Sequence, residues 1–370
     1  MKYYLIAGEA SGDLHGSNLI REIRKLDPDA DIRCWGGDLM QQAGGTLVSH
    51  YKERAFMGFL EVFLNIRKIM GFIKLCKKDL VAFHPDVVVF IDYPGFNIPI
   101  AEFAKKQGYK TVFYISPQVW AWKEGRVKTL RKVIDKMLVI LPFEKEFYAK
   151  WDYEVEYVGH PLVQVIDEYR NANTHLQPPA QTSVALLPGS RMQEIRKKLP
   201  IMLEATKNFP DCRFCIAQAP SLDRSFYETM TAQYGNVEIK QGKTYELLMQ
   251  SHAALVTSGT ATLETALFGV PEVVCYKGSA VSYEIAKRLI KVKYISLVNL
   301  ILDKPAVKEL IQHELTAENL TIELKKLLND TTHRKAVQQN LAELWAILSP
   351  GGAASKKTAQ IIVDFLKDLQ

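Results

Sequence analysis

The sequence has few cysteines, and they follow no regular spacing. The chain of 370 residues carries five, at positions 34, 76, 212, 215 and 275. An odd number of scattered cysteines excludes the disulfide framework of a small secreted protein and indicates free thiols in a reducing compartment. Cys212 and Cys215 form one C-x-x-C in a segment typical of a core strand, with no second Cys or His pair at zinc spacing. We therefore expect no metal site.

Long hydrophobic runs are also lacking. No apolar stretch reaches the roughly eighteen uninterrupted residues that identify a bilayer-spanning helix. The N-terminal run ends at the glycine turn after Ala7, which is too early for a signal-peptide core. We therefore expect a cytoplasmic protein, or one that lies on the surface of a membrane.

The charge of the chain is not strongly of one sign. The formal net charge is +6, with 24% charged and 48% hydrophobic residues. This balance is typical of a globular protein with a sizeable core. It favours anionic ligands or lipid head groups without requiring nucleic acid, so we expect no nucleic-acid partner.

Short apolar runs alternate with helical stretches along the chain. This pattern predicts parallel, doubly wound α/β sheets. Residues 1–165 form the expected N-terminal lobe, 166–182 a hinge rich in turn residues, 183–348 a C-terminal lobe and 349–370 a closing helix. The expected strands are Tyr3–Ala7, Val87–Ile91, Thr111–Ile115, Met137–Ile140, Val184–Leu187, Arg213–Ala217, Val237–Ile239, Ala253–Thr257 and Glu272–Tyr276.

The first strand is followed by a loop rich in glycine and polar residues, GEASGDLHG at positions 8–16. Ligands of doubly wound sheets bind outside the carboxyl ends of the strands, so this loop is expected to face a ligand. It does not match G-x-G-x-x-G and carries no P-loop Gly-Lys-Ser/Thr, which weakens nicotinamide and ATP hypotheses. Glu9 and His15 are candidate polar contacts. Capping of the next helix by Ser11 or Asp13 explains part of the same pattern.

A carboxylate follows the buried strand that ends at Ile91, in the motif IDYPGFN at positions 91–97. Poor solvation at such a position raises the pKa of a carboxyl group toward the range of a general base. Asp92 is therefore the candidate base, with helix capping as the alternative. Further along, the loop YISPQVWAW at positions 114–122 has two tryptophans suited to sugar faces or acyl chains, although core packing explains them nearly as well.

Two motifs in the second half of the chain suit a diphosphate. In the motif LLPGSR at positions 186–191, a glycine turn after a strand presents Ser190 and Arg191, and arginine binds phosphate by two parallel hydrogen bonds. In the motif TSGTATLE at positions 257–264, a helix begins with hydroxyls and glycine, and free N–H groups at a helix start bind anions. The residues expected to bind there are Ser258, Gly259 and Thr260, with Glu264 placed for ribose hydroxyls.

Together these motifs resemble the lipid-A-disaccharide synthase family. The resemblance extends from residue 3 to about residue 312 and also covers MGFLEV, LPFE, VGHPL and YISLVNL. It implies the GT-B fold, with two Rossmann-like doubly wound lobes and an interlobe cleft. It also implies a hexosyltransferase that needs no cofactor and acts by inversion. The implied substrates are UDP-2,3-diacylglucosamine as donor and 2,3-diacylglucosamine 1-phosphate as acceptor, which give a β-1′,6-linked disaccharide.

The resemblance also assigns individual residues. It implies that Asp92 is catalytic, that Arg191 binds phosphate, that Glu9 and Ser11 are the polar residues of the first loop, and that Asn299 lies near the donor. From the loop itself, we expect Glu9 or His15 to assist Asp92, and Ser11 and Gly12 to contact the donor. The sequence departs from some members at Gly95, where they carry a second aspartate, and at Lys308, where they carry proline. A mechanism with a second carboxylate at position 95 is thus excluded here. A homodimer is a separate possibility that the sequence leaves open.

Residues 56–78 combine apolar bulk with a basic second half, FMGFLEVFLNIRKIMGFIKLCKK. A core helix with a solvated basic end is the general expectation for such a segment. The acylated substrates favour instead a helix that rests on an anionic membrane, at the inner face of the inner membrane. The residues expected to make this contact are Phe56, Met57, Phe59, Leu60, Phe63, Lys74 and Lys78.

Two other functions remain as alternatives. Another sugar-nucleotide enzyme of the same fold, such as a transferase with a different acceptor or an epimerase, would share the motifs of the second lobe. A non-catalytic lipid-binding or tethering protein would have no need of Asp92, Arg191 and the Ser-Gly-Thr turn together. The motifs of the first lobe argue against the first alternative, and the presence of those three features together argues against the second.

Overall fold

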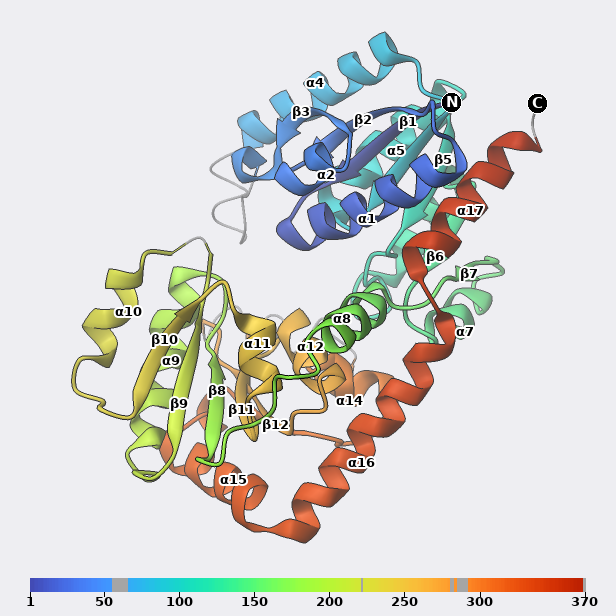
Figure 1. Ribbon diagram of the computed structural model, residues 1–370. Coiled ribbons are helices and arrows are strands. Elements are labelled where there is room, and N and C mark those ends of the chain that lie inside the picture. The colour runs from blue at the N-terminus through green and yellow to red at the C-terminus, as the bar shows by residue number, and fades with distance from the viewer. Residues whose placement is uncertain (55–65, 221, 280–282, 285–291, 369–370) are drawn as a thin grey trace. The chain divides into compact units, whose positions relative to one another are not determined.

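The computed structural model describes residues 1–54, 66–220, 222–279, 283–284 and 292–368 (Figure 1). The chain divides into two compact units. The first comprises Met1–Pro161 and Pro350–Gln370, and the second comprises Leu162–Ser349. The C-terminal segment therefore returns to the first unit.

The first unit is built on a seven-stranded sheet with the order β3-β2-β1-β4-β5-β6-β7. Every neighbouring pair in it is parallel. The strands are β1 (Lys2–Ala7), β2 (Asp31–Gly36), β3 (Thr46–His50), β4 (Val87–Ile91), β5 (Lys110–Tyr114), β6 (Lys136–Val139) and β7 (Glu156–Tyr157). Apart from the exposed Lys2 at the start of β1, strands β1 and β4 are buried along their length, because helices cover both faces of a parallel sheet.

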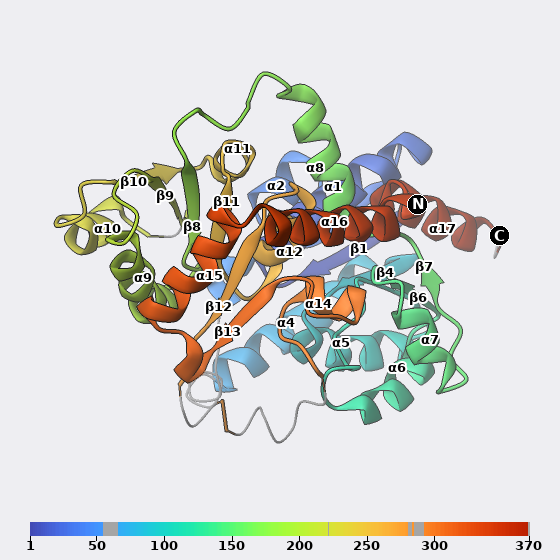
Figure 2. The ribbon, with the colours of Figure 1, turned by 90° about the horizontal axis from the view of Figure 1, so that it is seen from below.

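Helices cover both faces of this sheet. Those described are α1 (Ala10–Leu26), α2 (Asp38–Gln42), α4 (Ile66–Phe83), α5 (Pro94–Lys106), α6 (Val127–Val133), α7 (Glu144–Ala149) and α17 (Ala354–Lys367), with the 3-10 turns η1 (Tyr51–Arg54) and η2 (Glu124–Arg126). Buried side chains of α4, α5, α6 and α7 share one core with β4 and β5. Those of α1, α2 and α17 share the other. Figure 2 shows α4, α5 and α6 along one side of β1 and β4, with α1 and α17 on the other.

The second unit has a six-stranded sheet with the order β10-β9-β8-β11-β12-β13, again parallel throughout. The strands are β8 (Ser183–Leu187), β9 (Arg213–Gln218), β10 (Val237–Gln241), β11 (Ala253–Thr257), β12 (Glu272–Tyr276) and β13 (Lys308–Ile311). The described helices are α8 (Pro161–Ala172), α9 (Met192–Thr206), α10 (Arg224–Thr231), α11 (Thr244–Met249), α12 (Thr260–Leu267), α14 (Leu297–Leu302), α15 (Ala317–Asn329) and α16 (Thr331–Leu348). The 3-10 turns are η3 (Gln312–Glu314) and η4 (Ser349–Gly351).

Side chains of the second sheet alternate between two cores. Leu255 and Cys275 pack with α9 and α15 on one face, whereas Ala254 and Val256 pack with α11 on the other. This alternation follows from the two-residue period of a strand. It fixes which side chains of β11 lie under α9.

The expected α/β architecture and all the expected strands are confirmed, with ends shifted by a residue or two. The sequence pattern did not predict four further strands of the described chain, β2, β3, β7 and β13. β13 reads Lys-Glu-Leu-Ile and forms an edge of its sheet, where polar side chains reach solvent and no apolar run is needed. β7 has only two residues.

Candidate functional site

The motif loops of the first unit lie together at one edge of its sheet. Strands β1, β4 and β5 are neighbours, so the loops that follow Ala7, Ile91 and Tyr114 leave the sheet side by side. The strand order reverses between β1 and β4, and ligands of doubly wound sheets bind at such a switch point. The structure thus brings Glu9 and Asp92 to the position where this fold binds ligands.

Asp92 is held in an unusual backbone conformation. Its φ is 46° and that of Tyr93 is 51°, both in the left-handed region that side chains rarely adopt. The fully buried Asn97 amide donates a hydrogen bond of 2.6 Å to the Asp92 carbonyl. A Cβ at Gly8 would lie 2.2 Å from the Tyr93 ring, so only glycine lets the first loop pass there. The turn that carries Asp92 is therefore built by residues of both loops.

The Asp92 side chain reaches solvent, yet its pKa is raised to about 6. The largest cause is desolvation by the surrounding protein, followed by repulsion from the Glu9 carboxylate, while a main-chain hydrogen bond at Tyr93 opposes both. Glu9 is the N-cap residue of α1 and is half-buried. Asp92 is thus a carboxylate that can reach a substrate and change its protonation near neutral pH.

His15 is buried inside the first unit. Burial lowers its pKa to about 4, and its Nδ1 has no hydrogen-bond partner among the described residues. His160 is also buried, and burial, with a smaller repulsion from the nearby His15, lowers its pKa to about 3. Both imidazoles are therefore neutral at physiological pH. Asp13, a few residues earlier, does not cap its own helix but accepts from Gly37, Leu39 and Met40 at the start of α2.

The tryptophan loop after β5 is held in place by hydrogen bonding to the buried carboxyl group of Glu144. Trp120 donates to Glu144 through its indole nitrogen at 3.3 Å, and the main-chain nitrogens of Ile140 and Leu141 donate to the same side chain. Burial raises the pKa of Glu144 to about 7, against these hydrogen bonds. Trp122 remains 36% exposed at the end of the loop. Trp120 therefore positions the loop, and Trp122 stays exposed at its end, with the cationic groups of Lys123 and Arg126 over its ring.

The motif loops of the second unit lie at its own switch point, between β8 and β11. Gly189 has a φ of 126°, and a Cβ there would lie 2.7 Å from the Glu194 carboxylate, so the turn requires glycine. Ser190 and Arg191 follow, and Arg191 is the N-cap residue of α9. The Arg191 guanidinium is half exposed and lies 3.4 Å from Glu194. This arrangement presents a cation at the carboxyl end of β8.

The Ser-Gly-Thr turn lies beside it, after β11. Gly259 is the N-cap residue of α12, with a φ of 147°, and no side chain caps this helix start. Ser258, Gly259 and Thr260 are at least partly exposed. One turn later, Glu264 accepts a hydrogen bond of 3.0 Å from the Tyr245 hydroxyl, and burial raises its pKa. The helix start is therefore open to an anion, with a polar pair behind it.

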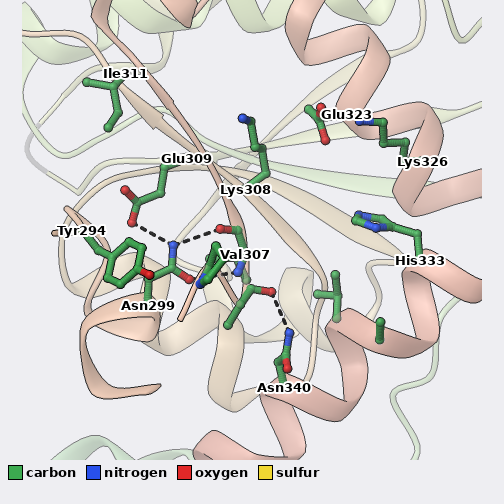
Figure 3. Close-up of a pocket in the computed structure, with 14 residues that line it drawn as sticks. Tyr294, Asn299, Val307, Lys308, Glu309, Ile311, Glu323, Lys326, His333 and Asn340 are labelled. Carbon is green, nitrogen blue, oxygen red and sulfur yellow. Dashed lines mark hydrogen bonds and ion pairs between the residues drawn. The ribbon is translucent and has the colours of Figure 1, made fainter. Parts of the chain in front are cut away.

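Asn299 is placed differently from the other expected donor residues. Its amide donates to the Val307 carbonyl and to Glu309 and accepts from the Val307 nitrogen, as Figure 3 shows. All of these distances are close to 3 Å, and Asn299 is 1% exposed. A cavity of about 590 Å³ lies over this cluster, with Lys308, Lys326 and His333 on its walls. The observed contacts give Asn299 a structural part, joining α14 to β13.

The expected membrane segment is described only from Ile66 onward. Phe56, Met57, Phe59, Leu60 and Phe63 lie outside the described residues. Lys74 and Lys78 are exposed on α4. Large apolar side chains are exposed beside them, with Ile66 at 53% and Met70 at 58%. No helix among the described residues is long and apolar enough to cross a membrane.

Two residues of the site were not singled out from the sequence. Asn97 and Glu144 lie inside the recognised motifs IDYPGFN and LPFE, so their presence was visible, but their hydrogen bonds depend on the fold. In the described part of the chain, no group of three or more His, Cys, Asp or Glu side chains is arranged to hold a metal ion.

Comparison with known proteins gives a family match over almost the whole chain. A model of the lipid-A-disaccharide synthetase family matches residues 3–363. The lipid-A-disaccharide synthase of Syntrophus aciditrophicus is 40% identical over 362 residues, which cover 95% of this chain and 94% of that protein. That of Geobacter metallireducens is 38% identical, covering 98% and 96%.

Solved structures resemble the chain in fold. The glycosyltransferase of kitacinnamycin superimposes with a TM-score of 0.68 at 14% identity and covers 99% of both chains. The calicheamicin glycosyltransferase CalG4 gives 0.63 at 17% identity, covering 99% of this chain and 98% of that one. UDP-GlcNAc 2-epimerase from Neisseria meningitidis, solved with UDP-GlcNAc, gives 0.61 at 14% identity over both full lengths. The two parallel-sheet lobes are those of the GT-B glycosyltransferase fold.

Proposed function

The chain belongs to the lipid-A-disaccharide synthase family, and from this premise we propose which of its residues carry out the reaction. The protein is a glycosyltransferase that moves 2,3-diacylglucosamine from UDP to 2,3-diacylglucosamine 1-phosphate. It forms the β-1′,6-linked disaccharide and releases UDP.

Asp92 acts as the general base. It takes the proton from the acceptor 6-hydroxyl as that oxygen attacks the anomeric carbon, and the bond from that carbon to UDP breaks in the same step. The observation that carries this assignment is a solvent-accessible carboxylate with a pKa near 6 at the switch point of the first unit. Above that pH the carboxylate is ionised and ready to accept a proton.

Glu9 acts on Asp92 through its charge. A second carboxylate nearby disfavours the ionised form of the base and so strengthens it as a proton acceptor. His15 is buried and neutral, so we assign it the task of supporting the first loop beside Glu9. Ser11 and Gly12 belong to the same loop, and Gly12 packs against Ala7, where a Cβ would lie 3.1 Å from the Ala7 side chain.

The donor diphosphate is assigned to the second unit. Arg191 can bind it by two parallel hydrogen bonds, with Ser190 beside it. The N–H groups at the Ser258–Thr260 helix start supply further donors. Stabilising the departing diphosphate in this way removes the need for an acid at the leaving group, because charge on the leaving oxygen is neutralised by fixed groups. Glu264 is placed for the ribose hydroxyls. Asn299 supports the donor site by joining α14 to β13.

The exposed face of α4 contacts an anionic membrane. Acylated substrates remain partly in a bilayer, so the enzyme must work at its surface, and we assign the inner face of the inner membrane. Ile66 and Met70 offer apolar contact, and Lys74 and Lys78 add positive charge. The phenylalanines and other apolar residues at 56–63 are proposed to extend this contact.

A product assay tests the proposed reaction. The purified chain is incubated with both acylated sugars, and the products are identified by mass spectrometry. We expect a disaccharide phosphate and UDP in equal amounts. An altered monosaccharide from the donor alone would indicate an epimerase instead, and no turnover with intact UDP binding would indicate a binding protein.

A further inference from the structure

Lys198 is a buried lysine that the assignments above do not use. It lies on α9, seven residues after Arg191, and is only 3% exposed. Its helical neighbours Ile195, Leu199 and Met202 belong to the apolar core on the same face of the sheet. Lysine is almost never fully buried unless it is paired, because removing an ammonium group from water is costly. A lysine in this stripe therefore requires an explanation.

The surroundings of Lys198 supply no partner for its charge. Among the described residues, no hydrogen bond or ion pair is formed by its ammonium group. Glu194, one turn earlier on the same face, is instead paired with Arg191. The Cys275 thiol is close, but burial raises its pKa to about 12, so it carries no charge. Burial also lowers the pKa of Lys198, although the nearby Glu194 carboxylate partly opposes this effect.

The position of the ammonium group can be located from its neighbours. Lys198 responds electrostatically to Arg191 and Glu194, after β8, and to Cys275, near the end of β12. Because β11 lies between β8 and β12, these neighbours place the group beside the carboxyl end of β11. Side chains of a helix point toward its N-terminus, which here is the end that carries Arg191. Lys198 thus points toward the carboxyl end of the sheet, where the Ser258–Thr260 turn follows β11.

A second polar group at this place also has no partner. Thr257 is the last residue of β11 and pairs in register with Cys275. Two residues before it, Leu255 packs under α9, so the Thr257 side chain lies on the same face as Lys198. Thr257 is 6% exposed, and its hydroxyl is buried without a hydrogen-bond partner in the described part of the chain. Buried polar groups without partners are rare and point to a ligand, an ion or water.

We propose that Lys198 is a second cation of the donor site and binds a phosphate oxygen of the nucleoside diphosphate. The inference rests on the proposed placement of the diphosphate at Arg191 and the Ser258–Thr260 turn. A phosphate oxygen there gives the Lys198 ammonium group the acceptor that the protein does not provide. Two cations then share the charge of the departing UDP, one from the N-cap of α9 and one from beneath the turn.

Calorimetric titration of the full-length protein with UDP and with uridine tests this proposal. Lys198→Met removes the charge but keeps an unbranched side chain that suits an apolar stripe, so the fold should be at least as stable. Lys198→Gln is a second variant in case the first does not fold. Lys197→Met is the matched control, because it removes the same charge from the exposed neighbouring position on α9. Arg191→Met reports independently on the donor site.

We expect Lys198→Met to weaken UDP binding by about 10- to 100-fold, as for a lost hydrogen bond to a charged group. Uridine binding should not change, and Lys197→Met should bind UDP like the wild type. The proposal is overturned if Lys198→Met binds UDP normally while Arg191→Met does not, and the donor site then stands without Lys198. It is equally overturned if uridine binding falls as much as UDP binding, or if Lys197→Met has the same effect. Normal UDP binding by both the Lys198 and Arg191 variants would instead contradict the proposed placement of the diphosphate at Arg191 and the Ser258–Thr260 turn.

Discussion

The Asn97 side chain donates a 2.6 Å hydrogen bond to the main-chain oxygen of Asp92. This contact joins the first turns of α5 to a residue whose φ of 46° would otherwise be unfavourable. The turn is held by the main chain of Asp92, and the Asp92 carboxylate itself accepts a main-chain hydrogen bond at Tyr93 while it remains accessible to solvent. A carboxylate that is fixed in place yet accessible can serve as a base.

Replacement of the base tests this separation of main chain from side chain. Asp92→Asn keeps the shape of the residue and should preserve folding and UDP binding. We expect turnover to fall by roughly 10²- to 10⁴-fold, the usual cost of losing a general base. Asp86→Asn is a suitable control, because Asp86 precedes the same strand at its opposite end. Near-normal turnover of Asp92→Asn in steady-state assays would assign the base to another residue.

The pH profile tests the influence of Glu9 on Asp92. Because the pKa of Asp92 is raised to about 6, turnover should fall as the pH decreases through that value and the base becomes protonated. Glu9→Gln removes the repelling charge, so the pKa of Asp92 should decrease and the acidic limb should move to lower pH. Measurement of kcat/KM between pH 4.5 and 8.5 is expected to show this shift. An unchanged limb in Glu9→Gln would show that desolvation alone sets the pKa.

Much of this site was accessible from the sequence because strands and ligand loops leave local patterns. A buried parallel strand is an apolar run, and the loop after it carries the polar residues, so Asp92, Arg191 and the Ser-Gly-Thr turn could be placed in advance. The strand order, which makes these loops neighbours at two switch points, came only from the structure.

Contacts between distant segments could not be predicted in the same way. Asp13 was a candidate cap for its own helix, but its carboxylate binds the start of α2 instead. Asn299 was expected near the donor, and its amide is occupied by Val307 and Glu309. In both cases the residue type shows that a polar partner is needed, and only the fold decides which partner is near. Lys198 is visible in the sequence as a charged residue at a position of α9 where the helical pattern is otherwise apolar.

Removal of divalent metals tests how the leaving group is stabilised. The proposal assigns the diphosphate charge to Arg191, Lys198 and a helix start, so turnover should persist in excess EDTA. Loss of activity that magnesium or manganese restores would contradict it. Arg191→Lys should also bind UDP poorly in calorimetry, because an ammonium group cannot make two parallel hydrogen bonds to one phosphate.

The exposed face of α4 makes a prediction about membrane binding that separates charge from apolar contact. Lys74→Glu/Lys78→Glu should reduce co-sedimentation with anionic vesicles, since each lysine near such a surface contributes about 1 kcal/mol at low salt. Lys356→Glu/Lys367→Glu changes the net charge equally on exposed positions of α17 and should bind like the wild type. Ile66→Ser/Met70→Ser should weaken binding even in high salt, where the contribution of the lysines is screened. Circular dichroism confirms that each variant is folded. If the α4 variants sediment like the wild type, this face of α4 is solvated surface and any membrane contact lies elsewhere.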